Sequence, residues 1–270
     1  MWRLADRWSA PTPTVVRVAD ARLTLDERFA LDREIYRGLF EAAELGLVAP
    51  LIQRGDSCVD VGANVGLYSV LFAARSVDGP VLAFEPTPTF ERLRDNLQPF
   101  PNATAFNFAL GAKPDTLRID PADGDHHASF RGTGDAGYEV EVRPLDDIAE
   151  VQALAEIDFM KIDVEGWESQ VMAGATSLWS QKRVAMALVE TNAGWGDPVD
   201  YLGTVEELGY RCFEIRLRLA AGRLRKVVDL RPLNLATIPP QINVLIVRPD
   251  RLERLCQRSV SYNSAYASTT

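Results

Sequence analysis

The sequence contains little cysteine and almost no histidine: three cysteines and two histidines occur among its 270 residues. Cys58, Cys212 and Cys256 are odd in number and far apart in the chain, and two of them lie in apolar segments, where a free thiol packs as a small hydrophobic side chain. Cysteines of this kind favour a reducing compartment, so we expect a cytoplasmic protein.

Long apolar stretches are also missing. Residues 1–10 include arginine and tryptophan but no extended apolar core. Nowhere does the chain offer the roughly 18 uncharged apolar residues that a membrane span requires. We therefore expect neither export nor a membrane span.

The sequence further lacks any run of lysine and arginine, and its formal net charge is −9. A negative long-range field repels phosphate backbones and anionic lipids, so nucleic acid is not an expected partner. The hydrophobic content of 47% and the charged content of 25% are ordinary for a globular protein, and 270 residues allow one sizeable core.

Short apolar runs alternate with amphipathic stretches along most of the chain, for example "CVDVG" followed by "LYSVLFAAR" and "VLAFEP" followed by "TFERLRDNL". This alternation predicts βαβ units and an α/β fold with one mostly parallel, doubly wound, Rossmann-like sheet of seven or more strands. Ligands of such sheets bind at the carboxyl ends of the strands, near the point where strand order reverses.

Three regions are expected along the chain. Residues 1–50 are predicted to form an N-terminal arm or edge strand, broken by proline, and then a helical segment between residues 26 and 51. Residues 51–250 form the main domain. Residues 251–270 end in small polar residues that predict a flexible tail.

The first predicted turn from strand to helix, "DVGANVGLYS", contains Gly62 and Gly66, which allow a tight turn and close approach to a ligand. A dinucleotide fingerprint needs a glycine where Asn64 stands, so the loop better suits a ligand without a diphosphate. Glu85 ends the next strand, where its carboxylate can accept both hydroxyls of a ribose. Each feature alone also occurs as an ordinary turn or a solvated strand end, but their order and spacing together predict an adenosine site.

These segments resemble the FkbM family of O-methyltransferases, which belongs to the class I methyltransferases that use S-adenosylmethionine. The resemblance also covers "ALG" at residues 109–111, "VRPLDDI" and, above all, "IDFMKIDVEGWESQVMAGA". It runs from about Gly55 to Glu190, and "INVLIV" suits the usual seventh strand. It implies a seven-stranded class I methyltransferase fold and methyl transfer to an oxygen, often a hydroxyl on a sugar or a polyketide.

The resemblance also implies the residues that contact the cofactor. The methionine part would lie against the first turn, at Asp60, Gly62, Asn64 and Gly66. The ribose would lie at Glu85, and the adenine near the residues after the third strand, which are Asn107, Phe108 and Ala109.

Acidic residues follow the fourth strand in "DFMKIDVEGWE". Methyl transfer from a sulfonium is an in-line displacement, and the acceptor alcohol needs a base or a metal to remove its proton. Since the end of the fourth strand faces the methyl group in this architecture, Asp163 is the first candidate for contact with the acceptor hydroxyl and Glu165 the second. Lys161 is equally well explained by a structural ion pair with one of these carboxylates.

Glu190 and Asn192 follow the fifth strand in "ALVETN". Some class I O-methyltransferases hold a divalent ion between an acidic residue after strand four and acidic and amide residues after strand five. By this similarity Asp163, Glu190 and Asn192 are candidate ligands of Mg²⁺. Glutamate stands where aspartate is more usual, and its longer side chain shifts the oxygen.

The two histidines, His126 and His127, lie together in the polar stretch "DPADGDHHASFRGTG". One of them is a candidate general base if this loop folds over the crevice, and Ser129 would then reach the cofactor or the acceptor. A plain surface loop is the alternative.

The acceptor and the assembly are open at this stage. Trp195, in "NAGWGDPVDYL", is a candidate platform for the CH faces of a sugar, or only a loop anchor, and it favours a saccharide, oligosaccharide or glycosylated small molecule as acceptor. A nicotinamide oxidoreductase shares the sheet and the ribose-binding acid, and a non-catalytic module of the same fold is a further alternative. A homodimer is one candidate assembly.

Overall fold

The computed structural model describes residues 13–121, 128–129, 137–192, 198–219, 226–239 and 241–256. The strands are β1 Thr14–Val18, β2 Ala21–Leu25, β3 Cys58–Val61, β4 Val81–Phe84, β5 Ala103–Phe106, β6 Ala109–Leu110, β7 Asp115–Pro121, β8 Ala128–Ser129, β9 Tyr138–Arg143, β10 Phe159–Ile162, β11 Met186–Asn192, β12 Arg211–Leu219, β13 Lys226–Pro232 and β14 Gln241–Val247. The helices are α1 Ala30–Tyr36, α2 Ala42–Val48, α3 Leu67–Ser76, α4 Phe90–Leu97, α5 Ala149–Gln152, α6 Glu168–Ala173, α7 Thr176–Ser180, α8 Pro198–Glu207 and α9 Leu252–Cys256.

The central sheet has eight strands in the described part of the chain, in the order β13-β12-β14-β11-β10-β3-β4-β5. The strands from β11 to β5 pair in parallel, whereas β14 is antiparallel to both β11 and β12, and β13 is antiparallel to β12. Strand order reverses between β3 and β10. The topology confirms the predicted doubly wound α/β fold of the class I methyltransferase type, and β14 is the strand that "INVLIV" predicted.

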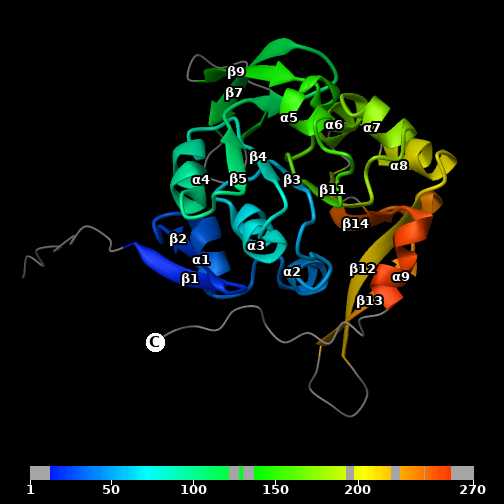
Figure 1. Ribbon diagram of the computed structural model, residues 1–270, viewed down its shortest axis with the longest axis horizontal. Coiled ribbons are helices and arrows are strands. Elements are labelled where there is room, and N and C mark those ends of the chain that lie inside the picture. The colour runs from blue at the N-terminus through cyan, green and yellow to red at the C-terminus, as the bar shows by residue number, and fades with distance from the viewer. Residues whose placement is uncertain are drawn as a thin grey trace, which may run out of the picture.

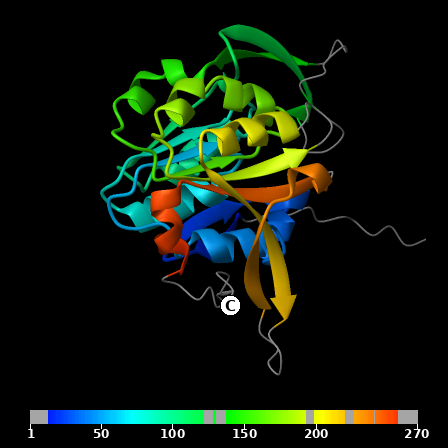
Figure 2. The same ribbon diagram turned by 90° about the vertical axis from the view of Figure 1, so that its right-hand side faces the viewer.

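Alternate residues of the central strands point to opposite faces of the sheet, and each face has its own core. Cys58 and Phe159 pack in one core with β1, β2 and helices α1 to α4, whereas Val59 and Met160 pack in the other core with α5 to α8. We call the first of these the N-terminal face. Figures 1 and 2 show the sheet between the two layers. Because the central strands are buried on both faces, they read as continuous apolar runs.

The N-terminal segment belongs to the first core. Val16 and Leu23 of the β1–β2 hairpin are buried there together with Ile35 of α1. The hairpin includes β2, which the sequence did not predict. The single helical segment expected over residues 26–51 is two short helices, because the chain turns between them at Gly38 and Glu41, whose φ angles are 64° and 41°.

The helical stretch after β10 is also divided, into α6 and α7. A Cβ atom on Gly174, between them, would lie 2.0 Å from the carbonyl oxygen of Gly111, so only glycine allows the two backbones to approach this closely. A second sheet in the order β6-β9-β7-β8 follows β5 along the chain, and its strands lie at the top of Figure 1.

Residues 251–256 of the expected tail are helical: Arg251 ends the 3₁₀-helix Pro249–Arg251, and α9 follows it directly. None of the helices in the described ranges has the length and apolar character needed to cross a lipid bilayer.

Candidate active site

The carboxyl ends of the central parallel strands meet at one edge of the sheet. Val61 of β3 pairs with Phe84 of β4 and with Ile162 of β10, and Ile162 pairs with Val189 of β11. The residues that follow these four positions therefore lie side by side: Gly62, Glu85, Asp163 and Glu190. Strand order reverses at this place, where ligand crevices of doubly wound sheets form.

Ionisable residues replace apolar ones at this end of the N-terminal face. Cys58 and Phe159 are apolar, but the next residues on the same face of their strands are Asp60 and Lys161, which pair in register and are each 2% exposed. Asp163 follows Lys161 on the same face. A strand that is apolar along its length and charged only at its carboxyl end has no packing reason for the charge, which indicates a ligand site.

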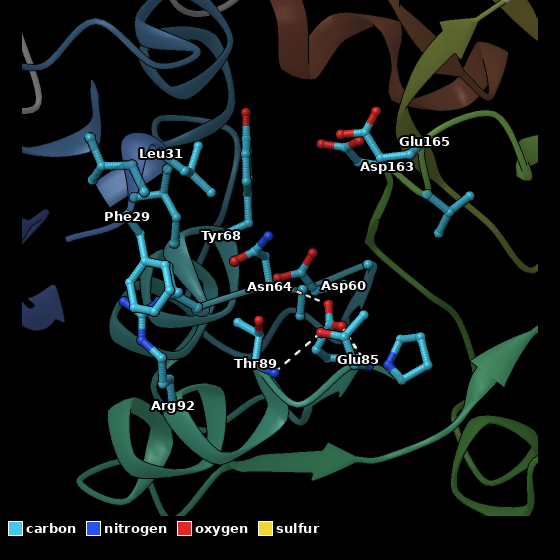
Figure 3. A pocket seen from close by; sticks show the side chains of 18 of the residues that line it. Phe29, Leu31, Asp60, Asn64, Tyr68, Glu85, Thr89, Arg92, Asp163 and Glu165 are labelled. Atoms are coloured by element: carbon cyan, nitrogen blue, oxygen red, sulfur yellow. Dashed lines mark hydrogen bonds between the residues drawn. The ribbon is translucent and has the colours of Figure 1, made fainter. Parts of the chain in front are cut away.

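A cavity of about 560 Å³ opens at these residues, within the usual size range of small-molecule sites. Figure 3 shows Phe29 and Leu31 on one side of it and Asp163 and Glu165 on the other, with Tyr68 between them. Six of the predicted site residues line it: Asp60, Gly62, Asn64, Glu85, Asp163 and Glu165.

Three residues of the first loop have left-handed backbone conformations: Gly62 with φ 79°, Asn64 with φ 49°, and Gly66. A Cβ atom on Gly62 would lie 1.8 Å from the carbonyl oxygen of Asp163, so glycine is required for the loops after β3 and β10 to touch. Gly66 has φ 93° and faces Leu93 of α4, but it does not line the cavity. Its role in this structure is packing, in place of the predicted contact with the cofactor.

Glu85 is buried, and its two carboxylate oxygens hold the surrounding backbone. One oxygen accepts a hydrogen bond from the Asn64 amide at 2.8 Å, and the other accepts one from the Thr87 amide at 2.9 Å. Burial raises the pKa of Glu85, although these hydrogen bonds oppose the shift. Each oxygen keeps a further lone pair, so the carboxylate can still accept hydrogen bonds from a ligand in the cavity.

Asp60 is a buried acid at the centre of the lining. Its carboxylate accepts a hydrogen bond from the Ser69 hydroxyl of α3. Burial raises the pKa of Asp60 from 3.8 to about 6, and the Ser69 hydrogen bond and Lys161 oppose this shift. At neutral pH Asp60 is therefore an anion within a nearly dry site, where a positively charged ligand group is favoured.

Lys161 holds Asp163 in place. Its ammonium nitrogen lies 2.8 Å from Asp163 Oδ2, 3.5 Å from Glu41 Oε1 and 4.9 Å from the centre of the Tyr68 ring. Burial disfavours the charge, but Asp163 and Glu41 outweigh it and raise the pKa of Lys161. The structural ion pair expected for Lys161 is present with Asp163, and the second ion pair, with Glu41, links β10 to the turn between α1 and α2.

Glu190 interacts with Asp163 from the neighbouring strand. Burial, a hydrogen bond to Asp163 and the negative charge of Asp163 raise the pKa of Glu190 to about 9. Glu190 therefore holds a proton at neutral pH and donates it toward Asp163, while one of its oxygens accepts a hydrogen bond from Gln241 Nε2 at 2.8 Å. Asp163 thus interacts with Lys161 on its own strand and with Glu190 on the neighbouring one.

Glu165 and Glu168 shape the loop that carries Asp163. Glu165 has a φ of 52°, and the next residue, Gly166, has a φ of 96°. Glu168 is buried and accepts hydrogen bonds from the amides of Val164 at 3.2 Å and Gly166 at 2.9 Å. The last acidic residue of the motif is therefore a support for the loop, a role that the sequence reading did not assign.

The metal prediction is not supported by the donor set. Within the described ranges, no three His, Cys, Asp or Glu side chains are grouped as metal ligands. Asp163 is bound to the Lys161 ammonium, and Glu190 accepts a hydrogen bond from Gln241. The side chain of Asn192 lies outside the described set. We therefore derive no step of the chemistry through Mg²⁺.

The residues predicted for adenine do not line the cavity. Phe108 packs against Phe84 and Phe106 with ring centroids 5.5 and 5.7 Å apart, and Ala109 is buried in the small core of the second sheet. Asn107 donates a hydrogen bond to the Glu85 carbonyl at 2.9 Å, so it positions the acid. Ile119 of β7 and Tyr138 of β9 line the cavity instead.

Three other predictions lie outside what the structure describes. They concern His126 and His127 as a general base, the side chain of Ser129, and Trp195 as a sugar platform. They stay predictions.

The N-terminal segment supplies lining residues that the sequence reading missed. Phe29, Leu31 and Phe40 line the cavity from α1 and its flanks, and Arg92 of α4 lies 4.6 Å over the Phe29 ring. Arg92 is ion-paired with the buried Asp32 of α1. One signal of this wall was available in the sequence. Asp32 lies on the apolar side of a short helix, and a buried acid needs a partner from another part of the chain.

Comparison with known proteins gives a family match and distant relatives. Residues 60–212 match the family model described as the methyltransferase FkbM domain. The hexuronic acid methyltransferase AglP of Haloferax volcanii is 28% identical over 182 residues, which cover 65% of this chain and 68% of that protein. The 31-O-demethyl-FK506 methyltransferase FkbM of Streptomyces tacrolimicus is 30% identical over 174 residues, which cover 51% of this chain and 66% of that protein.

The chain thus spans about two thirds of the length of these two curated relatives. Among solved structures, a TehB-like SAM-dependent methyltransferase from Corynebacterium glutamicum is 13% identical, with a TM-score of 0.44 over 81% of this chain and 94% of that chain.

Proposed function

The chain belongs to the FkbM methyltransferase family, and from this premise we propose that it is an S-adenosylmethionine-dependent O-methyltransferase that acts on a hydroxyl of a saccharide or a secondary metabolite. Because the chain belongs to a methyltransferase family, the alternative of a nicotinamide oxidoreductase no longer applies. The observation that carries the proposal is the placement of Asp60, Glu85 and Asp163 around one cavity.

The donor set fits S-adenosylmethionine. Glu85 keeps a free lone pair on each oxygen for the ribose hydroxyls, and Asp60 offers a buried anion to the positively charged methionine part. Gly62 leaves space beside the Asp163 carbonyl, where a side chain would block the junction of the two loops. The sulfonium supplies the methyl group when the cofactor is bound.

Asp163 is proposed to meet the acceptor. The acceptor oxygen forms a bond to the methyl carbon, the carbon–sulfur bond breaks with its electron pair moving to sulfur, and the hydroxyl proton passes to Asp163. Because Lys161 and the protonated Glu190 both stabilise its charge, Asp163 is a weak base that takes the proton only as the oxygen loses its electron density to the new bond. Its main contribution is then orientation of the hydroxyl.

The acceptor class is proposed from the relatives and from the lining. One relative is named for a hexuronic acid and another for position 31-O of FK506, so both hydroxyl-bearing sugars and macrocyclic metabolites are represented. In this chain Phe29, Phe40 and Tyr68 line the cavity beside the acids. Aromatic faces and carboxylates together suit a hydroxyl-bearing ring.

Two measurements test the proposal. Calorimetric titration with S-adenosylhomocysteine is expected to show one site per chain, and NAD(P)H is expected not to bind. A screen of glycosides and polyketide alcohols with methyl-labelled S-adenosylmethionine, followed by mass analysis, is expected to find a product heavier by one methylene group. Tight NAD(P)H binding without any response to S-adenosylhomocysteine would reject the proposal.

A further inference from the structure

The connection between α1 and α2 exposes large apolar side chains at the cavity. Leu39 is 68% exposed and Tyr36 is 47% exposed, whereas the adjacent Phe40 lines the cavity. We call Tyr36, Leu39 and Phe40 the apolar rim. Isolated exposed apolar residues are ordinary, but Tyr36 and Leu39 directly follow and precede the lining residues Ile35 and Phe40 in the chain, which marks this connection as a surface that a ligand can cover.

The apolar rim lies on the side of the cavity where the acceptor is expected. Glu41, the next residue after Phe40, contacts the Lys161 ammonium at 3.5 Å, and the same ammonium contacts Asp163 at 2.8 Å. The rim is therefore tied by two ion pairs to the carboxylate proposed to orient the acceptor hydroxyl. Figure 3 shows Glu85 near Thr89, apart from Asp163 and Glu165.

The segment that carries the rim is held firmly against the sheet. Asp32 is 1% exposed, pairs with Arg92 and accepts a hydrogen bond from the Asp26 amide at 2.5 Å. At the other end, Glu44 accepts a hydrogen bond from Asn243 of β14 at 3.3 Å. A segment with polar anchors on both sides of the rim, one buried and one half-buried, presents a defined surface, so the exposure of Leu39 is a built feature of the fold.

The same segment lies outside the part of the chain that matches the family model, which begins at residue 60. The cofactor candidates Asp60, Gly62, Asn64 and Glu85 all lie inside it. The candidate cofactor residues thus lie within the matched range, whereas the apolar rim lies before it.

We infer that the acceptor carries an apolar portion, aliphatic or aromatic, that packs on the apolar rim while its hydroxyl lies at Asp163. This inference rests on the proposed methyl transfer and narrows its substrate class, because a free hydrophilic monosaccharide would leave Leu39 and Tyr36 in water. An acceptor whose apolar portion covers one large apolar side chain of the rim is expected to have a kcat/KM roughly tenfold or more above that of an acceptor without this portion.

The experiment compares glycosides of one sugar that differ only in the aglycone: methyl, hexyl and 4-nitrophenyl. With labelled S-adenosylmethionine, kcat/KM for the hexyl or nitrophenyl compound is expected to exceed that for the methyl compound by at least about tenfold. In Leu39→Ser this ratio of kcat/KM values is expected to fall to about twofold. The variant is expected to fold normally, because the Leu39 side chain is largely exposed. The ratio is expected to persist in Val77→Ser, which removes a 46% exposed apolar residue at the end of α3, outside the cavity lining.

A binding measurement keeps the inference testable when none of the three sugars is methylated. Protein saturated with S-adenosylhomocysteine is titrated with the same compounds and followed by ligand-observed NMR, and only the hexyl and nitrophenyl glycosides are expected to bind. Equal affinity or equal kcat/KM across the three compounds, no binding of the apolar ones up to their solubility limit, or an unchanged ratio in Leu39→Ser would overturn the inference. If S-adenosylhomocysteine itself fails to bind, the proposed function fails instead, so the two failures are distinct.

Discussion

Replacing Asp60 by asparagine is expected to make the protein more stable and less functional. Burial raises the pKa of Asp60 from 3.8 to about 6. The folded protein therefore keeps the proton up to about pH 6, whereas the unfolded chain releases it near pH 3.8, so wild-type stability falls as pH rises through this interval. The difference corresponds to about 3 kcal/mol above pH 7.

The Asp60→Asn variant has no charge to bury. Its side-chain oxygen can still accept the hydrogen bond that Ser69 donates, so the local packing is kept. We expect its free energy of unfolding to exceed that of the wild type by about 3 kcal/mol at pH 8, and by roughly half as much at pH 5, where wild-type Asp60 is largely protonated. Binding of S-adenosylmethionine at pH 8 is expected to weaken by at least about tenfold, because the anion opposite the methionine part is gone.

Urea unfolding followed by circular dichroism at both pH values measures the first effect, and calorimetric titration measures the second. Asp20→Asn, an exposed aspartate in the β1–β2 turn, is the matched control and is expected to shift stability by less than about 0.5 kcal/mol at either pH. A gain that is equal at pH 5 and pH 8, or a loss of stability at pH 8, would refute the reasoning.

Four further outcomes are expected. Asp163→Asn should lower turnover by about 100-fold or more while leaving S-adenosylhomocysteine affinity within a factor of about ten; unchanged turnover contradicts the assigned role. Glu190→Gln mimics the protonated acid, so turnover at pH 7 should change by less than about threefold, and the wild-type change in rate near pH 9, the pKa of Glu190, should disappear from the pH–rate profile. Lys161→Met leaves Asp163 and Glu41 buried without their ammonium and should lower the free energy of unfolding by about 3–5 kcal/mol in urea titrations; a loss below about 1 kcal/mol would show that the pairs are dispensable. Treatment with EDTA should leave turnover within about twofold, and a loss restored by Mg²⁺ would reinstate the metal hypothesis.

Local pattern was enough to predict the sheet. The helices predicted at 67–75 and 89–97 are α3 and α4, because each follows a fully buried strand and a turn whose residues suit it. Strand β2 of the N-terminal hairpin and strand β13 were missed. Their stability depends on partners elsewhere, since β1 and β2 are buried only where they pack on the first core.

The candidate site was predicted in part for the same reason. Asp60, Glu85 and Asp163 stand where buried strands end, and a charge at such a position is visible in the sequence. Phe108 does not line the cavity, because its ring packs against Phe84 and Phe106 of the central sheet, a contact between strands that the local sequence does not reveal.

By itself the sequence determined the order of strands and helices, the turn chemistry around Gly62, and the presence of acids at the strand ends, because each depends on residues that are neighbours in the chain. Only the tertiary structure decided which charged side chains form ion pairs and that the N-terminal segment lines the cavity beside them. Lys161 meets Glu41 across 120 residues of sequence, and Glu190 keeps its proton because Asp163 lies on the adjacent strand in a buried place. Ionisation and ion pairing depend on burial and on distance in space, which no local pattern contains.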